Sequence, residues 1–291
     1  MNYAETKELK IIVKKALAED IGFGDITTKL FIPKGSKVKA IILAKEDLIV
    51  CGVPVAKQVF KQLDKNISFT ALINEGAAAK KNDVIAKISG KTRSILSAER
   101  VALNFLGFLS GIATKTKEFV EAIQPYKTKI LDTRKTIPGL RALEKYAVRI
   151  GGGYNHRMSL DEMVLIKDNH IQVTRSPGHK VTSIKDIINQ IRNRIPKGMK
   201  IEIEVEDLKQ FREALNEKPD IIMLDNMSTS QIKEAVRLRN NLSGNYKPLL
   251  EASGGITLAN IKDYASTGVD MISIGALTHS IDSVDVSLEI L

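Results

Sequence analysis

Cysteine, tryptophan and aromatic residues in general are scarce in this chain, and each scarcity narrows what the protein can be. The 291 residues include one cysteine, Cys51, so an intrachain disulfide is excluded and a reducing compartment is favoured. Cys51 lies in the apolar string LIVCGV, which predicts a buried, inert thiol rather than a nucleophile. Tryptophan is absent and aromatic residues make up 5%, which argues against a protein that stacks nucleic-acid bases on aromatic platforms.

The sequence also has little that would direct it to a membrane. The opening stretch MNYAETKELK contains no apolar signal region. No apolar run approaches the ~20 residues that span a bilayer. We therefore expect a cytoplasmic protein with no membrane partner.

Length, composition and charge point to a two-domain protein that binds anions. A chain of 291 residues fits two domains, and 43% hydrophobic residues supply a large core. The formal net charge of +10 suggests either nucleic acid or small polyanions, such as a phosphorylated sugar and a dicarboxylate, as partners. The basic residues between 129 and 170 lie at the ends of predicted elements and among glycines, not along one helix face. This placement favours small anions over nucleic acid.

The first third of the chain mixes strand and helix patterns. Residues 5–18 place apolar side chains at helical spacing, and a second helical pattern covers residues 53–64. Strand patterns cover residues 37–44, 68–73 and 83–88. These patterns predict an α+β layer that ends near residue 95, and we assign residues 1–110 to an N-terminal α+β sandwich domain.

From about residue 96 the rhythm becomes strand then helix, repeated. Candidate strands cover residues 129–133, 163–167, 200–206, 220–225, 248–253 and 271–276, and helical patterns cover residues 183–194, 208–215, 228–240 and 258–267. Repeated β-α units predict parallel strands with right-handed crossovers. Six strands, with room for one more, favour an α/β barrel, closed or incompletely closed, over residues 111–279. No G-x-G-x-x-G motif follows the first of these strands, which argues against a dinucleotide-binding fold.

Polar residues gather where the predicted barrel strands end. In a β/α barrel the carboxyl ends of the strands surround one mouth, where enzymes of this fold place their active sites. The residues at these ends are Thr133, Arg134, Lys135, Lys167, Glu204, Asp225, Ser253 and Gly275. Six separate segments are therefore expected to converge on one cavity, which favours an enzyme.

The strand IEIEVE predicts carboxylates inside the barrel. Its three glutamates alternate with apolar residues that should face the helices, so the glutamates should face the interior. Interior carboxylates are costly unless paired, and Lys135 and Lys167 are natural partners. For Glu202, the alternative to a functional role is a structural ion network inside the barrel. Glu204 together with Asp225 is expected to bind ribose hydroxyls and a hydrated Mg²⁺, which needs only one or two carboxylates besides phosphate oxygens.

Glycine-containing loops after the last two strands predict a phosphate site, and a basic loop predicts a carboxylate site. The phosphate-binding candidates are Ser253, Gly254, Gly255, Ile274, Gly275 and Ala276. Free backbone N–H groups at these two loops are the usual phosphate cradle of such barrels. His279 either joins this cradle or is an ordinary surface histidine. His156 and Arg157 follow three glycines at 151–153, which permit positive φ or close approach to a ligand, and with Arg134 they are candidates to hold two carboxylates.

Several motifs together resemble the quinolinate phosphoribosyltransferase family, the decarboxylating enzymes of NAD synthesis. They run in order from EDIGFGDITT through LDTRKTIPGLR, GGGYNHRMSL, VLIKDNH, IEIEVE, MLDN and EASGGI to SIGALTH. The resemblance implies transfer of a phosphoribosyl group from phosphoribosyl pyrophosphate to quinolinate with loss of CO2, with Mg²⁺ as cofactor. It also implies an incomplete, TIM-like barrel joined to an open sandwich, with residues 280–291 returning to the first domain.

The same resemblance implies roles for individual residues. Lys135, Lys167, Glu204 and Asp225 would carry catalysis, with the last two binding the metal directly or through water. The substrate-binding set would be Arg100, Thr133, Arg134, Lys135, His156, Arg157, Lys167, Glu204, Asp225, Ser253, Gly254, Gly255, Ile274, Gly275, Ala276 and His279. The assembly would be a homodimer or a dimer-based hexamer, in which Arg100, from the match SAER, reaches the active site of a neighbouring subunit.

Two alternatives stay open from the sequence. A paralogue of the same fold would use another pyridine or a molybdate-related substrate, and it would be inactive with quinolinate. A basic RNA-binding protein would bind with an affinity that falls steeply with salt. The placement of the basic residues leads us to expect no nucleic-acid partner.

Overall fold

The computed structural model describes residues 7–174 and 183–291, which form two compact units. The first unit runs up to residue 117 and adds residues 136–152 and 276–291. The second unit consists of residues 118–135 and the chain between 153 and 275. Each unit contains its own sheet.

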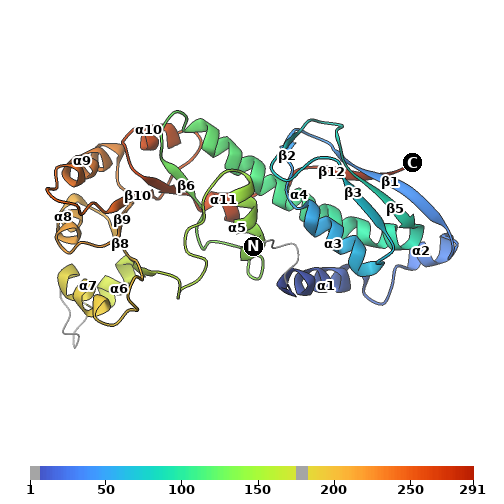
Figure 1. Cartoon of the computed structure of the whole chain (residues 1–291), viewed down its shortest axis with the longest axis horizontal. Coiled ribbons are helices and arrows are strands. Elements are labelled where there is room, and N and C mark those ends of the chain that lie inside the picture. The colour runs from blue at the N-terminus through green and yellow to red at the C-terminus, as the bar shows by residue number, and fades with distance from the viewer. Residues whose placement is uncertain (1–6, 175–182) are drawn as a thin grey trace. The chain divides into compact units, whose positions relative to one another are not determined.

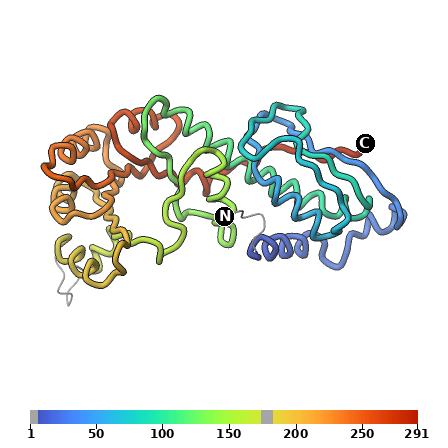
Figure 2. Tube along the Cα trace, in the orientation of Figure 1, coloured from blue at the N-terminus to red at the C-terminus, as the bar shows by residue number. Residues whose placement is uncertain are grey.

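The first unit is built on an antiparallel sheet with the strand order β12-β1-β5-β3. The strands are β1 (Lys37–Ala44), β3 (Ser68–Ala71), β5 (Val84–Lys91) and β12 (Val286–Ile290), and a separate pair joins β2 (Leu48–Ile49) to β4 (Ala78–Ala79). Figure 2 shows β12, from the end of the chain, running beside β1, and the register extends from Ala40 opposite Ile290 to Ala44 opposite Val286. The predicted strands over 37–44, 68–73 and 83–88 are confirmed to within a few residues.

The first unit also contains helices, one of which begins at a recognisable local signal. They are α1 (Lys7–Ile21), α2 (Ile26–Phe31), α3 (Val53–Leu63), α4 (Thr92–Ala122, whose last residues enter the second unit), α5 (Arg141–Ile150) and α11 (Ala276–His279). Asp25 caps α2 by accepting the Thr28 N–H at 2.9 Å. The sequence patterns predicted α1 and α3; residues 5 and 6 of the α1 prediction lie outside the described residues.

Helix α4 is long and apolar enough to be a membrane-spanning candidate by length and composition alone. The expectation that no apolar run approaches this length is wrong here, because no charged residue lies between Arg100 and Lys115. In the structure 67% of its most apolar window is buried inside the fold, including Leu106, Leu109 and Ile112. This burial is typical of a core helix. Cys51 packs in the same core, where burial raises the pKa of its thiol, as expected for an inert cysteine.

The second unit is a parallel six-stranded sheet with the order β6-β11-β10-β9-β8-β7. The strands are β6 (Lys129–Leu131), β7 (Val164–Ile166), β8 (Ile201–Val205), β9 (Ile221–Asp225), β10 (Leu249–Ser253) and β11 (Met271–Ser273). The helices α6 (Asp168–Thr174), α7 (Ile184–Arg192), α8 (Leu208–Asn216), α9 (Thr229–Asn240) and α10 (Ile261–Ala265) connect them, and Figure 1 shows α7 to α10 along the outside of the sheet. Repeated β-α units with parallel strands confirm the predicted rhythm.

The barrel is incomplete, because β6 and β7 form the two edges of the sheet within the described residues. A single residue, Tyr154, lies against the free edge of β6. Its N–H donates to the Ile130 carbonyl at 2.8 Å, and its own carbonyl accepts the Asp132 N–H at 3.1 Å. The segment that carries His156 and Arg157 is thereby fixed beside β6, where a further strand of a closed barrel would run.

Candidate active site

The carboxyl ends of the parallel strands bring most of the predicted site residues to one edge of the sheet. Asp225 and Ser253 are the last residues of β9 and β10 and lie directly opposite each other in the register. Glu204 is the penultimate residue of β8, Lys167 follows β7, and residues 133–135 follow β6. The chain after β11 continues through Ile274 and Gly275, where the second unit ends.

Lys167 and Glu204 form an ion pair at this edge. Lys167 Nζ lies 2.7 Å from Glu204 Oε2, with the glutamate side chain 8% exposed and the lysine 44% exposed. Burial raises the pKa of Glu204; Lys167 opposes this shift, and Asp225 adds to it. The predicted pairing of a strand glutamate with Lys167 is therefore confirmed for Glu204. The proximity of Asp225 also brings two carboxyl groups together, as a metal site requires.

Arg157 is a buried cation with an unused donor. Its side chain donates from Nη1 to the Met163 carbonyl at 2.8 Å, and the residue is 8% exposed. The Nε–H is buried and finds no hydrogen-bond partner among residues 7–174 and 183–291. Burial lowers the pKa of Arg157, as does the nearby Arg134, whereas Glu202 raises it. Two arginines side by side, one with an unsatisfied buried donor, form a site that an anion would stabilise.

His156 faces inward, toward buried carboxyl groups. Its side chain is 7% exposed, and Nε2 lies 3.0 Å from Glu202 Oε2 and 3.6 Å from Glu251 Oε2. Nδ1 accepts the Arg157 N–H at 2.8 Å, and the His156 N–H donates to Asp132 Oδ1 at 2.9 Å. The close partner of Glu202 is thus His156 rather than a lysine, which fits the alternative of a structural ion network for this glutamate. The role of His156 in substrate binding stays a prediction.

Sequence reasoning missed Glu251. It lies within the apolar strand PLLEAS, from which only Ser253 was selected as a candidate. The same signal that drew attention to Glu202, a carboxylate inside a buried strand, was present there. Glu202 on β8 and Glu251 on β10 are both fully buried, and β9 lies between their strands; each lies within ion-pair distance of His156.

The loops after β9 and β10 pack closely against each other, and this contact requires a glycine at position 254. Gly254 has φ +93°, and a Cβ there would lie 2.1 Å from Asn226 Oδ1. The Asn226 N–H donates to the Ser253 carbonyl at 2.8 Å. Gly255 also has positive φ, +63°, but its Cβ position is open. The loop thus keeps an accessible stretch of backbone at Gly255, as a predicted phosphate-binding loop requires.

The triple glycine meets one of its two expected uses, since Gly152 has φ +91°, whereas Gly151 serves helix packing. A Cβ on Gly151, the C-cap of α5, would lie 2.4 Å from the Ala113 carbonyl of α4. This glycine therefore permits close packing of two helices in the first unit rather than close approach of a ligand. His170 is likewise structural, since its Nδ1 accepts the Lys167 N–H at 2.9 Å where α6 begins.

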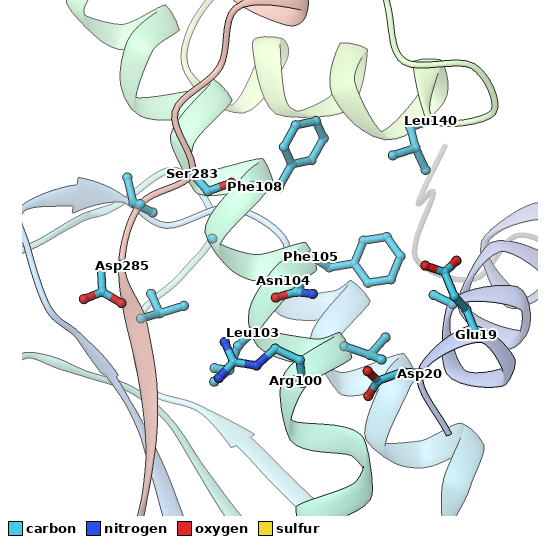
Figure 3. Close-up of a pocket in the computed structure, with 15 residues that line it drawn as sticks. Glu19, Asp20, Arg100, Leu103, Asn104, Phe105, Phe108, Leu140, Ser283 and Asp285 are labelled. Atoms are coloured by element: carbon cyan, nitrogen blue, oxygen red, sulfur yellow. The ribbon is translucent and has the colours of Figure 1, made fainter. Parts of the chain in front are cut away.

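Three predicted site residues belong to the first unit: Arg100, Ala276 and His279. Arg100 is exposed on α4 and lines a cavity of about 830 Å³ together with Glu19 and Asp20 of α1, as Figure 3 shows. His279 is exposed at the end of α11, with Nδ1 2.7 Å from Ser280 Oγ. Their roles stay predictions.

Lys135 and Thr133 lie on the loop after β6. The Lys135 side chain is exposed, and its N–H donates to Thr133 Oγ1 at 3.1 Å. Residues 133–135 thus form a short turn stabilised by a side chain, and Arg134 is its central residue. The predicted roles of both residues in binding substrate stay predictions.

Comparison with known proteins places both halves of the chain. The N-terminal domain of quinolinate phosphoribosyl transferase matches residues 25–110, and the C-terminal domain matches residues 112–289. The chain is 46% identical over 283 residues to the probable nicotinate-nucleotide pyrophosphorylase (carboxylating) of Methanocaldococcus jannaschii, covering 96% of each. It is 40% identical to that of Mycobacterium leprae, covering 96% of this chain and 95% of the relative. The solved structure of the nicotinate-nucleotide pyrophosphorylase from Francisella tularensis superposes with a TM-score of 0.88 at 41% identity, covering 98% and 96% of the two chains.

Proposed function

Because the chain belongs to the quinolinate phosphoribosyltransferase family, we propose that it transfers the phosphoribosyl group of phosphoribosyl pyrophosphate to quinolinate. The products would be nicotinate mononucleotide, pyrophosphate and CO2. The observation that carries the proposal is the buried Arg157 with its unsatisfied Nε–H beside Arg134. Two adjacent guanidinium groups suit a rigid substrate with two neighbouring carboxylates.

The charges at the sheet edge fit the two steps of this reaction. As pyrophosphate leaves, positive charge develops on the ribose ring, and the carboxylates of Glu204 and Asp225 would stabilise it. Lys167, paired with Glu204 at 2.7 Å, would face the phosphates, and Lys135 the leaving group. Loss of the carboxylate beside the ring nitrogen then leaves a carbanion, which the arginines would stabilise. Preorganised charge can serve both steps without a nucleophile.

The residues at this edge also fit a magnesium ion, which we propose as the cofactor. Glu204 and Asp225 are hard oxygen donors, Asp225 lies close enough to raise the pKa of Glu204, and Mg²⁺ is usually held by one or two carboxylates with substrate phosphates and water. When bound, the ion would neutralise charge on the pyrophosphate leaving group. The lysines alone would neutralise it poorly.

The deciding experiment measures CO2 released from carboxyl-labelled quinolinate. Release should require both phosphoribosyl pyrophosphate and Mg²⁺, and excess chelator should stop it. The Arg157→Ala variant should lose quinolinate binding, whereas Arg149→Ala, an exposed arginine on α5, serves as the matched control. Turnover in excess chelator would contradict the magnesium assignment. Inactivity with quinolinate but turnover of another pyridine would point to the paralogue.

We also propose that the enzyme works as a homodimer or a dimer-based hexamer, with Arg100 contributed by the neighbouring subunit. The support is the motif match around Arg100 and its exposed position on α4. We likewise propose that the protein is cytoplasmic and has no nucleic-acid or membrane partner.

A further inference from the structure

His156, Glu202 and Glu251 form a buried group in the second unit. One ligand-type atom from each residue lies within 4.8 Å of the others, a spacing at which a metal ion would fit. Neither glutamate is exposed, and none of their four carboxylate oxygens receives a well-aligned hydrogen bond from residues 7–174 or 183–291. Such a costly arrangement calls for a role.

The hydrogen bond at Nδ1 argues against a metal at this group. Nδ1 of His156 accepts the Arg157 N–H at 2.8 Å, so in the neutral ring the hydrogen lies on Nε2. A metal on Nε2 would move that hydrogen to Nδ1, where it would face the Arg157 N–H, donor against donor. Histidines that bind metals normally donate their second N–H to an acceptor. The Nε2–H tautomer instead suits the carboxylates at 3.0 and 3.6 Å.

The same contacts link the two glutamates to Arg157. The backbone of Arg157 is held by the His156 ring, and its guanidinium is held by the Met163 carbonyl at 2.8 Å. Glu202 also favours the charged form of Arg157. The imidazole ring of His156 therefore connects the glutamates of β8 and β10 to the backbone of Arg157.

We propose that Glu202 and Glu251 are positioning residues, which hold His156 in its Nε2–H tautomer and thereby fix Arg157 for binding a substrate carboxylate. The proposal rests on the proposed function only in its last step, the use of Arg157 for quinolinate. It gives His156 an orienting role toward Arg157 in addition to its predicted place in the substrate-binding set. It also explains why an interior carboxylate comes from each of two strands, since together they flank one N–H.

The first test observes the ring directly. The chain has four histidines, so ¹⁵N-histidine NMR is tractable, and the His156 signals are assigned by their loss in His156→Asn. We expect the Nε2–H tautomer in the wild-type protein and in Glu202→Gln, which keeps an acceptor oxygen. We expect Glu202→Leu to lose this single tautomer. An Nδ1–H tautomer or a fully protonated ring in the wild-type protein would overturn the proposal, whether or not the leucine variant folds.

The second test separates positioning from mere stability. Glu202→Leu should raise KM for quinolinate on the order of ten-fold or more, the size of one charged hydrogen bond, with kcat and KM for phosphoribosyl pyrophosphate little changed. Glu202→Gln should restore most of the affinity. Glu206→Gln, an exposed glutamate just past the same strand, is the matched control. Equal losses in kcat and in the affinities for both substrates would overturn the proposal.

Two further outcomes separate this inference from its alternatives. Stoichiometric Mn²⁺ or Zn²⁺ binding that disappears in Glu251→Gln would make the group a metal site and overturn the positioning role. If the wild-type ring has the Nε2–H tautomer but the protein neither binds nor turns over quinolinate, the proposed function fails while the link between the glutamates and His156 is supported.

Discussion

At the scale of single residues, the described part of the second unit buries three carboxyl groups completely, and such burial is costly. Asp132, Glu202 and Glu251 are each 0% exposed. Asp132 accepts hydrogen bonds from the His156 N–H and from the Asn155 side chain, which offset its burial. Burial, and then the charge of Glu202, raises the pKa of Glu251 to about 8, with Asp132 adding to the shift and His156 opposing it. Glu251 therefore keeps its proton to a higher pH in the folded protein than an ordinary glutamate does.

This proton predicts a pH dependence of stability. The ordinary glutamate pKa is 4.5, so between that value and about 8 the folded protein binds one proton more than the unfolded chain. The contribution of Glu251 to stability is therefore present below this window and is lost as the pH rises through it. Urea unfolding at several pH values should show the free energy of unfolding falling more steeply for the wild type than for Glu251→Gln. Parallel curves for the two proteins would contradict the assignment.

The proposed roles of Glu204 at the ribose and of Arg157 at the quinolinate carboxylates give a second prediction. Glu204→Gln removes a charge used more in the transition state than in the ground state, so it should lower kcat by orders of magnitude. Arg157→Ala should mainly weaken quinolinate binding. Steady-state kinetics and calorimetric titration of quinolinate distinguish the two. Equally poor quinolinate binding in both variants would show that the split is wrong.

At the scale of elements, most of the strands and several of the helices were predictable because their hydrophobic periods are local. Strand β1 matches its predicted range of 37–44, and the six parallel strands all fall within their predicted ranges. Helix α2 was not predicted, because six residues are too few to show a period. It is held by contacts from elsewhere, since the Arg93 guanidinium donates to the Lys29 and Ile32 carbonyls.

In the site, too, contacts that follow from local sequence patterns were predictable, and contacts that depend on distant segments were not. The pairing of Lys167 with Glu204 followed from strand alternation and from the position of each residue near a strand end. The meeting of His156 with Glu251 did not, because it depends on how a loop beside β6 is placed relative to β10. No pattern within either segment encodes that placement.

The loops after β9 and β10 allow a matched pair of substitutions. Gly254→Ala and Gly255→Ala both place alanine at positive φ, which costs about 1 kcal/mol of strain. Only Gly254→Ala also drives a Cβ against Asn226, so we expect it to lose about 1–3 kcal/mol more and to displace Asp225. Urea unfolding and KM for phosphoribosyl pyrophosphate measure both effects. Equal losses in the two variants would remove the special role of the Asn226 contact.

At the scale of the whole molecule, the proposed sharing of sites between subunits is testable by mixing. If Arg100 acts in the partner's site and Lys135 in its own, each single-variant homodimer has two broken sites, whereas a mixed dimer has one intact site. Random pairing of Arg100→Ala and Lys135→Ala makes about half of the dimers mixed, so activity should recover to roughly a quarter of wild type. The two inactive proteins are unfolded, refolded together and assayed. No recovery, with mixed dimers confirmed by mass, would place Arg100 outside the neighbouring site.

Because β12 pairs with β1, the first sheet can be completed only late in the synthesis of the chain. Lys45 at the end of β1 and Glu289 in β12 form an ion pair across 244 positions of sequence. At about 5–20 residues per second of synthesis, β1 waits on the order of ten seconds or longer for its neighbour to leave the ribosome. During that time one edge of the first sheet has unpaired backbone groups, which is where a growing chain is most prone to associate with another. Protease protection of stalled nascent chains would reveal this interval as a first unit that becomes resistant only after residue 290 has emerged.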